Sequence, residues 1–159
     1  MERLQQYDVV VVGGGTAGVS AAVGAAKTGA KTLLIERNAY LGGEATNSGV
    51  SAFCGFYTCG ENPVRVVEGV GRLVLNEMEA LGPTVDYVIS ATGNRNINFQ
   101  PEYLKCAMDN LLEKERVDYL LHTSVIGADT ENGTITAIHC VDDEGTFTVA
   151  ARAFVDASG

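Results

Sequence analysis

A buried run of residues followed by closely spaced glycines constrains this chain more than any other feature. Residues 8–12 read Asp-Val-Val-Val-Val, and a β-branched run that is apolar on both faces is typical of a central parallel strand. Gly13, Gly15 and Gly18 follow, and residues 16–28 are compatible with a helix. In such a turn, the first glycine allows the backbone to turn tightly, the second lets a phosphate approach the backbone, and the third lets the helix pack closely on the strand. The segment predicts a strand, a phosphate-binding turn and a helix.

A second strand and an acidic residue extend this pattern. Gly29 ends the predicted helix, and residues 32–35 form another buried apolar run. Glu36 closes this run 23 residues after Gly13, where a carboxylate accepts hydrogen bonds from the two hydroxyls of a ribose. We therefore expect a βαβ unit that binds a dinucleotide whose ribose carries no 2′-phosphate. Either NAD or FAD fits these residues.

The charge of the chain limits its partners. Twenty acidic and 11 basic residues among 159 give a net charge of −9, so nucleic acid is not expected as a partner. The phosphates of a dinucleotide need no lysine, because backbone N–H groups and the helix dipole hold them. The apolar runs are too short for a membrane span, and the first residues contain no apolar signal core. Four cysteines without metal-ligand spacing complete the pattern of a cytoplasmic protein, with no metal site expected.

The middle of the chain predicts a long loop and helical elements. Residues 38–63 are rich in Gly, Asn, Ser and Thr, and so long a loop is usually functional. Apolar residues recur at helical spacing over 67–81, and Pro101 opens a second amphipathic helix. Between them, residues 85–89 and 97–99 form a predicted hairpin. We interpret 63–110 as an insertion of helices and a hairpin directed toward a substrate domain.

The last part of the chain predicts more strands. Residues 119–122 form a third buried strand, and 153–155 form the final one. Asn132-Gly133 and Glu144-Gly145 separate three alternating runs, at 125–129, 134–141 and 146–150, which indicates an antiparallel meander. The predicted fold class is α/β: a Rossmann-like FAD/NAD(P)-binding fold with a parallel sheet, a βαβ start and an antiparallel β-meander crossover.

Several segments resemble a known family of flavoproteins. Residues 9–18 are similar to the amino terminus of the glutathione-reductase-like FAD superfamily, and Glu36-Arg37 followed by Leu41-Gly42-Gly43 resembles its second strand and loop. The branch related to the flavin subunit of heterodisulfide reductase is similar at 41–47, 101–105, 120–125 and 154–159. The resemblance covers nearly the whole chain and implies FAD as the cofactor.

The resemblance also implies a role for each matching residue. The pyrophosphate would lie on Gly13, Gly14, Gly15, Thr16, Ala17 and Gly18. The adenosine end would contact Glu36 and Arg37, with Ser124 and Val125 beside the adenine. The ribityl chain and flavin would pass Gly42, Gly43, Glu44 and Ala45, and the last strand would approach the cofactor at Ala157, Ser158 and Gly159.

Two departures from the family pattern qualify this expectation. Disulfide reductases of the superfamily carry cysteines at places that correspond to Ala45 and Val50, so their dithiol mechanism is not expected. Members of the family also continue beyond the Ala-Ser-Gly segment, usually into a substrate domain. We therefore expect residues 1–159 to be the N-terminal part of an FAD-binding domain, with the C-terminal half missing.

The predicted function is FAD binding in an oxidoreductase that passes hydride or electrons through the flavin. The alternatives are an NAD-binding dehydrogenase domain and a flavin-binding module or subunit without turnover. The expected partners are a small-molecule substrate, a redox partner protein or a second copy of the chain. No catalytic residue is assigned.

Two weaker groups of residues remain open. Cys54 and Cys59 lie in the long loop, and we expect unpaired thiols there rather than a redox pair. Arg65, Arg72 and Arg95 form either a carboxylate clamp or, as we expect, ordinary solvated charges.

Overall fold

The computed structural model describes residues 5–82 and 85–159. The chain divides into two compact units. The first unit consists of the residues up to Leu41 together with Leu112–Gly159, and the second unit is Gly42–Leu111. The second unit is thus inserted, in sequence, into the first.

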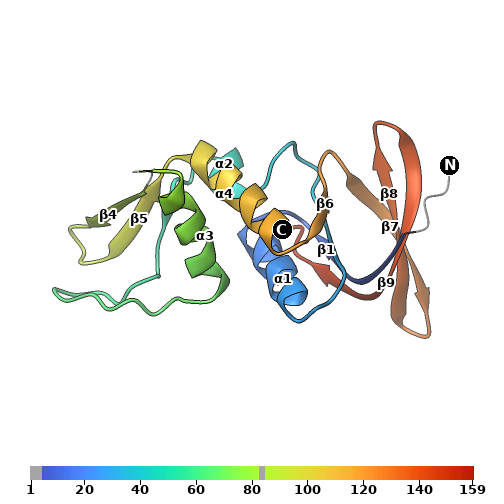
Figure 1. Cartoon of the computed structure of the whole chain (residues 1–159), viewed down its shortest axis with the longest axis horizontal. Helices are drawn as coiled ribbons and strands as arrows, with labels where there is room; N and C mark the ends of the chain where they lie inside the picture. Colours follow the sequence, from blue (N-terminus) through green and yellow to red (C-terminus); the bar gives the residue numbers. More distant parts are fainter. Residues whose placement is uncertain (1–4, 83–84) are drawn as a thin grey trace. The chain divides into compact units, whose positions relative to one another are not determined.

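The first unit is built on a mixed sheet, and Figure 1 shows its strands with the helix α1 beside them. The strands are β1 (Gln5–Val12), β2 (Thr32–Ile35), β6 (Asp118–Leu120), β7 (Ser124–Glu131), β8 (Thr134–Asp142) and β9 (Gly145–Asp156). Their order is β6-β2-β1-β9-β8-β7. The pairs β6–β2, β2–β1 and β1–β9 are parallel, whereas β9–β8 and β8–β7 are antiparallel. The predicted α/β class, with its βαβ start and β-meander, is confirmed.

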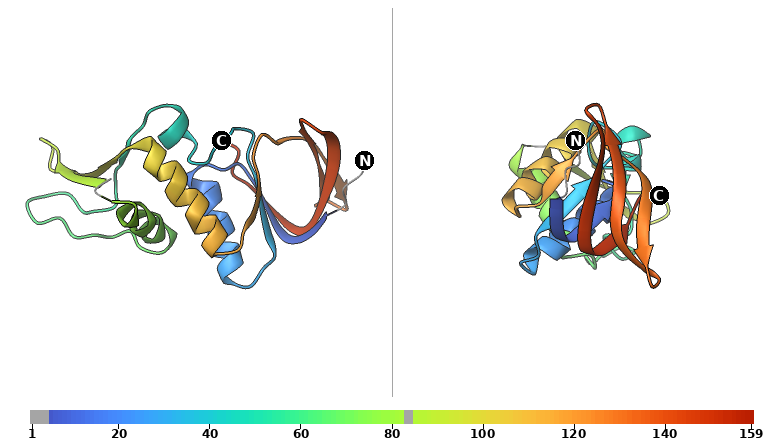
Figure 2. Two further views of the ribbon diagram at one scale, coloured as in Figure 1. Left: turned by 45° about the horizontal axis from the view of Figure 1, so that its top comes forward. Right: turned by 90° about the vertical axis from the view of Figure 1, so that its right-hand side faces the viewer.

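One strand differs from the prediction. The runs at 146–150 and 153–155 are parts of the single strand β9, which lacks a turn between them. Its first half pairs with β8 through Gly145–Ala150, and residues 149–156 pair with β1. Arg152 interrupts the apolar pattern without interrupting the strand, because β1 pairs with β9 on both sides of it, from Val149 to Asp156. Figure 2 shows β8 and β9 as long, curved strands.

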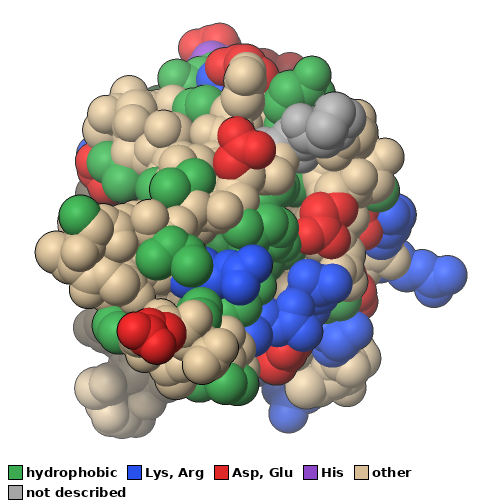
Figure 3. Space-filling view, turned by 90° about the vertical axis from the view of Figure 1, so that its left-hand side faces the viewer, with side chains coloured by type: hydrophobic (Ala, Val, Ile, Leu, Met, Phe, Trp, Pro, Cys, Tyr) green, Lys and Arg blue, Asp and Glu red, His purple; other side chains and the backbone are tan. Residues whose placement is uncertain are grey.

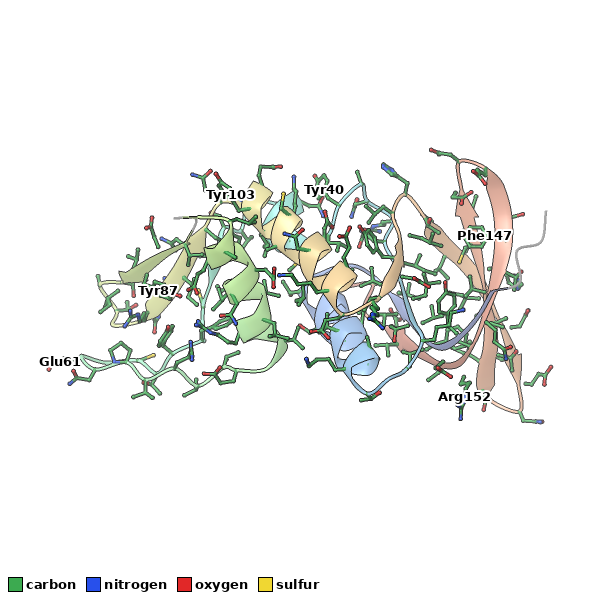
Figure 4. All side chains as sticks on the ribbon, viewed as in Figure 1. Tyr40, Glu61, Tyr87, Tyr103, Phe147 and Arg152 are labelled. Atoms are coloured by element: carbon green, nitrogen blue, oxygen red, sulfur yellow. The ribbon has the colours of Figure 1, made fainter. Side chains whose placement is uncertain are left out.

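The core of the first unit lies between the sheet and α1 (Thr16–Lys27) and within the curve of the meander. The helix contacts β1, β2 and β9 and buries Gly18, Val19, Ala22 and Val23. A cluster of buried side chains joins the parallel strands to the meander: Tyr7, Val10, Leu33, Ile35, Ile138, Cys140 and Val149. Phe147, labelled in Figure 4, packs against this cluster. The meander is therefore part of the same folded unit as the βαβ start.

The second unit combines helices with a small antiparallel sheet. Its elements are α2 (Glu44–Asn47), β3 (Ala52–Phe53), α3 (Val70–Ala80), β4 (Val85–Ile89), β5 (Arg95–Phe99) and most of α4 (Pro101–Lys114), and the sheet order is β3-β5-β4. The predicted hairpin is present, and β5 begins two residues earlier than expected, at Arg95. The first predicted helix begins at Val70 rather than at residue 67. The long loop contains α2 and β3, which are too short to leave a periodic pattern.

The helices of the second unit bury the faces that their sequences predict. Val74, Leu75 and Met78 of α3 are buried, as are Leu104, Ala107, Met108, Leu111 and Leu112 of α4. Phe53 packs against Phe56 and Phe99, with ring centroids 5.6 and 4.5 Å apart. None of the helices in the described part of the chain has the length and hydrophobicity to cross a membrane.

Candidate functional site

The glycine turn between β1 and α1 has the geometry that its spacing predicts. Gly13 has a φ of +104°, and its N–H donates to the carbonyl oxygen of Ile35 at 2.8 Å. A Cβ on Gly13 would lie 2.8 Å from Cα of Ser158, and one on Gly18 would collide with the carbonyl oxygen of Gly13. Glycine is required at both positions, because the end of β9 and the first turn of α1 approach the backbone so closely.

The N-terminus of α1 is suited to an anion. The helix has 12 residues and begins after Gly15, which makes no side-chain cap. Its first N–H groups have no partner within the helix, and no acidic residue lies in its first turn. Thr16 and Ala17 are exposed at this end. The backbone here can therefore donate to a phosphate group.

Glu36 forms a link between the glycine turn and the segment after β2. The side chain is buried, and Oε2 accepts a hydrogen bond from the N–H of Gly14 at 2.6 Å. Oε1 accepts from the backbone N–H and the side-chain Nδ2 of Asn38, both at 2.7 Å. An ionised carboxylate has about four lone-pair sites, so acceptor capacity remains on this side chain. The predicted contact between Glu36 and a ribose stays a prediction.

A cavity of about 520 Å³ opens beside these residues in the first unit. It lies at the carboxyl ends of β1, β2 and β9, where parallel α/β sheets bind their ligands. Of the predicted residues, its lining includes Gly13, Glu36, Arg37, Ser124, Val125 and Ser158. The structure therefore gathers residues from four separate segments of the sequence around one cavity.

The remaining predicted residues of the first unit do not line this cavity. They are Gly14, Gly15, Thr16, Ala17, Gly18, Ala157 and Gly159. The N–H of Gly14 donates to the carboxylate of Glu36. The N–H of Ala157 donates to the carbonyl oxygen of Val12 at 2.8 Å and so joins the ends of β9 and β1. These two residues thus support the residues that face the cavity.

Several residues of the cavity carry no signal that the sequence analysis used. The meander supplies apolar side chains, among them Ile135 and Ile138, and β9 supplies Phe154. Thr123 is buried, and its backbone N–H donates to the carbonyl oxygen of Glu36 at 3.0 Å. A polar residue directly after a predicted strand is the only signal that marks Thr123. The side chains match a nucleoside, because a base needs apolar contacts and a ribose needs acceptors.

Asp156 ends β9 at the edge of this cavity. Its Oδ1 accepts hydrogen bonds from the hydroxyl of Ser158 at 2.7 Å and from the backbone N–H of Ser158 at 3.0 Å. The Ser158 hydroxyl, and then its N–H, hold the pKa of the Asp156 carboxyl below the ordinary value. The hydroxyl expected to approach the cofactor therefore donates within the turn.

The Gly42-Gly43 loop belongs to the second unit. Gly42 and Gly43 have φ values of +110° and +55°, and a Cβ on Gly42 would collide with the side chain of Thr46. The backbone N–H of Ala45 donates to Gly42 at 3.2 Å; Ala45 is buried and Glu44 is exposed. The expected contacts of these residues with the ribityl chain and flavin stay predictions.

The cysteines of the long loop are separate thiols. Cys54 and Cys59 are free and exposed, and Cys59 Sγ lies 2.8 Å from Oδ1 of Asn94, to which it donates. In the described part of the chain, no three His, Cys, Asp or Glu residues gather in a way that could hold a metal ion. The redox role of the two thiols stays a question for experiment.

A mixed sheet with a glycine turn and a cavity at the carboxyl ends of its parallel strands defines a dinucleotide-binding α/β protein. The model of the FAD dependent oxidoreductase family matches residues 8–159. The chain belongs to this family, and its cofactor is FAD. The prediction of FAD rather than NAD is confirmed, and an NAD-binding dehydrogenase domain is no longer needed as an alternative.

Individual relatives agree with this family. The chain is 31% identical to the thiamine thiazole synthase of Aeropyrum pernix over 173 residues, which cover 100% of the chain and 57% of that protein. It is 53% identical to the glutathione reductase of Yarrowia lipolytica over 49 residues, or 31% of the chain and 10% of the reductase. The chain thus spans less than two thirds of either relative.

Solved structures share the fold. The geranylgeranyl bacteriochlorophyll reductase-like protein of Thermoplasma acidophilum superposes with a TM-score of 0.67 and 22% identity, over 99% of this chain and 40% of that one. At this identity the likeness supports the architecture of the chain, not a substrate.

Proposed function

We propose that the first unit binds the adenosine and pyrophosphate of FAD in an oxidoreductase that passes hydride or electrons through the flavin. The observation that carries this proposal is the cavity where Gly13, Glu36 and Ser158 meet beside the N-terminus of α1. The bound flavin supplies the redox chemistry, so the chain needs only to bind, orient and shield it.

Each group of predicted site residues suits one part of the cofactor. The N–H groups at the start of α1 donate to the pyrophosphate, and the free acceptor capacity of Glu36 suits the ribose hydroxyls. Ile135, Ile138 and Val125 offer apolar contact to the adenine. The Gly42-Gly43 loop, whose backbone only glycine adopts readily, is our candidate for the ribityl chain and flavin.

A finer assignment rests on the resemblance stated above. We propose that the chain belongs to the branch of the glutathione-reductase-like superfamily related to the flavin subunit of heterodisulfide reductase. Similarity to a glutathione reductase over 49 residues supports the superfamily. Ala45 and Val50 stand where the disulfide reductases carry cysteines, so a dithiol at those positions takes no part in the reaction.

The organisation of the whole protein is also a proposal. We propose that residues 1–159 are the N-terminal part of a longer FAD-binding domain and that 63–110 extend toward a substrate domain. The lengths of the relatives support this, since the chain spans 57% of the thiamine thiazole synthase. Four free cysteines favour a reducing compartment such as the cytoplasm. A small substrate, a redox protein or a second copy of the chain would be the partner.

The absorption spectrum of the purified chain tests the proposal. If the chain binds FAD, the protein fraction after gel filtration should show absorption bands at about 370 and 450 nm. Bleaching of the 450 nm band by a candidate donor would identify an enzyme. A chain that retains flavin but is reduced by no donor would instead support the second candidate, a flavin-binding module without turnover. A chain that excludes FAD at every concentration would contradict both.

A further inference from the structure

The second unit holds an arginine that has no acidic partner among the described residues. Arg95 opens β5 and lies opposite Ile89 of β4, on the sheet face that also carries Tyr87. Its guanidinium carbon lies 4.8 Å from the ring centre of Tyr57 and 5.3 Å from that of Tyr87. Within the described residues, its side chain makes no hydrogen bond or ion pair. Arg95 is therefore a positioned cation with unused donors.

The neighbouring arginines of this unit are paired. Nε of Arg65 lies 2.6 Å from Oε1 of Glu68, and Nη2 of Arg72 lies 3.8 Å from Oε2 of Glu79. Arg65 also pairs through its backbone with Tyr57, the residue whose ring Arg95 contacts. The contrast indicates that the lack of a partner is particular to Arg95 rather than general to the arginines here. Figure 3, a space-filling view from the left-hand side of Figure 1, shows several Lys and Arg side chains close to hydrophobic ones.

The nitrogen atoms of Arg95 are not equally accessible. Nε is buried and has no acceptor, and a buried donor without a partner is rare in folded proteins. The two terminal nitrogens are not buried in this way, so they remain open to solvent. Two terminal N–H groups side by side match the two oxygens of a carboxylate. The guanidinium is thus fixed at its inner end and open at the end that recognises planar anions.

The rings that hold Arg95 are themselves fixed. Tyr57 and Tyr87 meet edge to face at 89°, with centroids 6.3 Å apart. The Tyr87 hydroxyl donates to Oε1 of Glu79 at 2.7 Å, and burial, together with this bond, raises the pKa of Tyr87. Tyr87 therefore stays neutral and presents only its ring to the cation. Figure 4 labels Tyr87 on the hairpin. Because the Arg95 side chain is already held in place, it loses less conformational entropy when an anion binds.

The surroundings select among anions. Ile89 is 56% exposed and Tyr87 is 37% exposed, so apolar surface adjoins the cation. Glu68 and Glu79 are paired with Arg65 and Arg72, which leaves the single charge of Arg95 to balance an anion, and one charge matches a carboxylate better than a dianion such as phosphate. An acid with an apolar body would satisfy both the guanidinium and the exposed apolar side chains.

We propose that Arg95, held by Tyr57 and Tyr87, binds the carboxylate of a small organic acid whose apolar body lies against Ile89. For Arg95 alone, this takes up the alternative of a carboxylate site in place of our expectation of an ordinary solvated charge. The binding of the acid does not depend on the proposed function. Its role as the substrate of a flavin enzyme rests on that function.

Titration of the purified chain with hexanoate tests this site, using calorimetry and tyrosine emission. The chain has no tryptophan, so the tyrosines can be followed directly. Arg95→Gln should weaken hexanoate binding by at least about tenfold, because charged hydrogen bonds are lost. Arg95→Lys should bind with intermediate affinity, since it keeps the charge without the planar fork. Arg65→Gln is the matched control, and there the affinity should change less than about twofold.

Two further probes define the ligand class. Hexan-1-ol has the same apolar body without the charge and should not bind, and inorganic phosphate should bind more weakly than hexanoate. The proposal fails if hexanoate does not bind, if phosphate binds more tightly, or if Arg95→Gln and Arg65→Gln weaken binding equally. Melting curves of the variants show whether each is folded.

The flavin spectrum of the same samples separates this proposal from the proposed function. Hexanoate binding without FAD binding would contradict the flavin site alone. FAD binding without hexanoate binding would contradict the Arg95 site alone.

Discussion

Single residues in this protein hold the backbone in place at the candidate cofactor site. Glu36 is the clearest case, since one carboxylate joins Gly14 of the glycine turn to Asn38 beyond β2. Both contacts orient the turn before any ligand arrives. The side chain therefore contributes to the stability of the folded chain. Because we propose that it also binds the ribose of FAD, a substitution there should change both the stability and the affinity for FAD.

Replacement of Glu36 by Ala should weaken FAD binding by about 1.5–3 kcal/mol, the range for hydrogen bonds to a charged group. It should also lower the free energy of unfolding, because the N–H of Gly14 and the Asn38 amide lose their acceptor. Flavin-fluorescence titration and urea unfolding measure the two effects. If FAD affinity changed by only a few tenths of a kcal/mol, the ribose contact would have to be made by another residue.

Replacement of Gly15 by Val should abolish FAD binding, because a branched side chain at the start of α1 would occupy the space of the pyrophosphate. Gly24 provides a matched control in the same helix, since a Cβ there would meet no atom within 4 Å. Gly24→Ala should leave FAD binding unchanged and stabilise the chain by about 0.5–1 kcal/mol. Unchanged FAD affinity in Gly15→Val would contradict the assignment of the phosphate turn.

The sequence predicts the candidate site in part, and the residues show where the prediction stops. Gly13 and Gly18 follow from the motif because their spacing reflects close backbone approaches. Ile138 and Phe154 could not be predicted to line the same cavity as Glu36. Their places depend on which strands pair and in which register, and local pattern does not contain that information.

At the scale of elements, the pattern succeeds where an element is long and periodic. The strands β1 and β2 and the buried faces of α3 and α4 agree with their apolar patterns. The four residues of α2 and the two of β3 have no period to detect. The sequence predicts two strands in place of β9 because Arg152 breaks the apolar run, whereas pairing with β1 from Val149 to Asp156 keeps the strand continuous after its pairing with β8 ends at Ala150.

A contact between β1 and the edge strand β6 predicts a pH dependence of stability. The hydroxyl of Tyr7 on β1 donates to Oδ2 of Asp118 on β6 at 3.0 Å. Burial, and then the hydrogen bond and the charge of Asp118, raise the pKa of Tyr7 from its ordinary value of 10.0 to about 12. The unfolded chain loses this proton first as the pH rises. The folded chain should therefore keep its full stability below pH 10 and lose part of it between pH 10 and 12.

Urea unfolding at several pH values measures this loss, which should be on the order of 2 kcal/mol for the wild type. Tyr7→Phe should remove most of this component, and Tyr103→Phe should retain it, because Tyr103 is exposed on α4. Equal slopes in the wild type and Tyr7→Phe would show that other groups dominate the alkaline loss.

At the scale of the whole molecule, the two units divide the predicted cofactor contacts between them. The cavity, the glycine turn and Glu36 all belong to the first unit, whereas Gly42 and Gly43 belong to the second. The first set matches the adenosine and pyrophosphate, and the second set is proposed for the flavin end. A ligand that contains only the first half of FAD should therefore report on the first unit alone.

This division predicts that two substitutions have different effects on the binding of ADP and of FAD. Glu36→Ala should weaken the binding of ADP and of FAD by the same factor, because the proposed contact is with the adenosine half, which both ligands contain. Gly43→Ala should weaken FAD several-fold and leave ADP unchanged, because the φ of +55° at this position strains any residue with a Cβ. Competition of ADP against bound FAD measures both affinities in one experiment. Melting curves should show that Gly43→Ala remains folded, and an equal loss of ADP and FAD in that variant would contradict the proposal that the Gly42-Gly43 loop binds the flavin end of the cofactor.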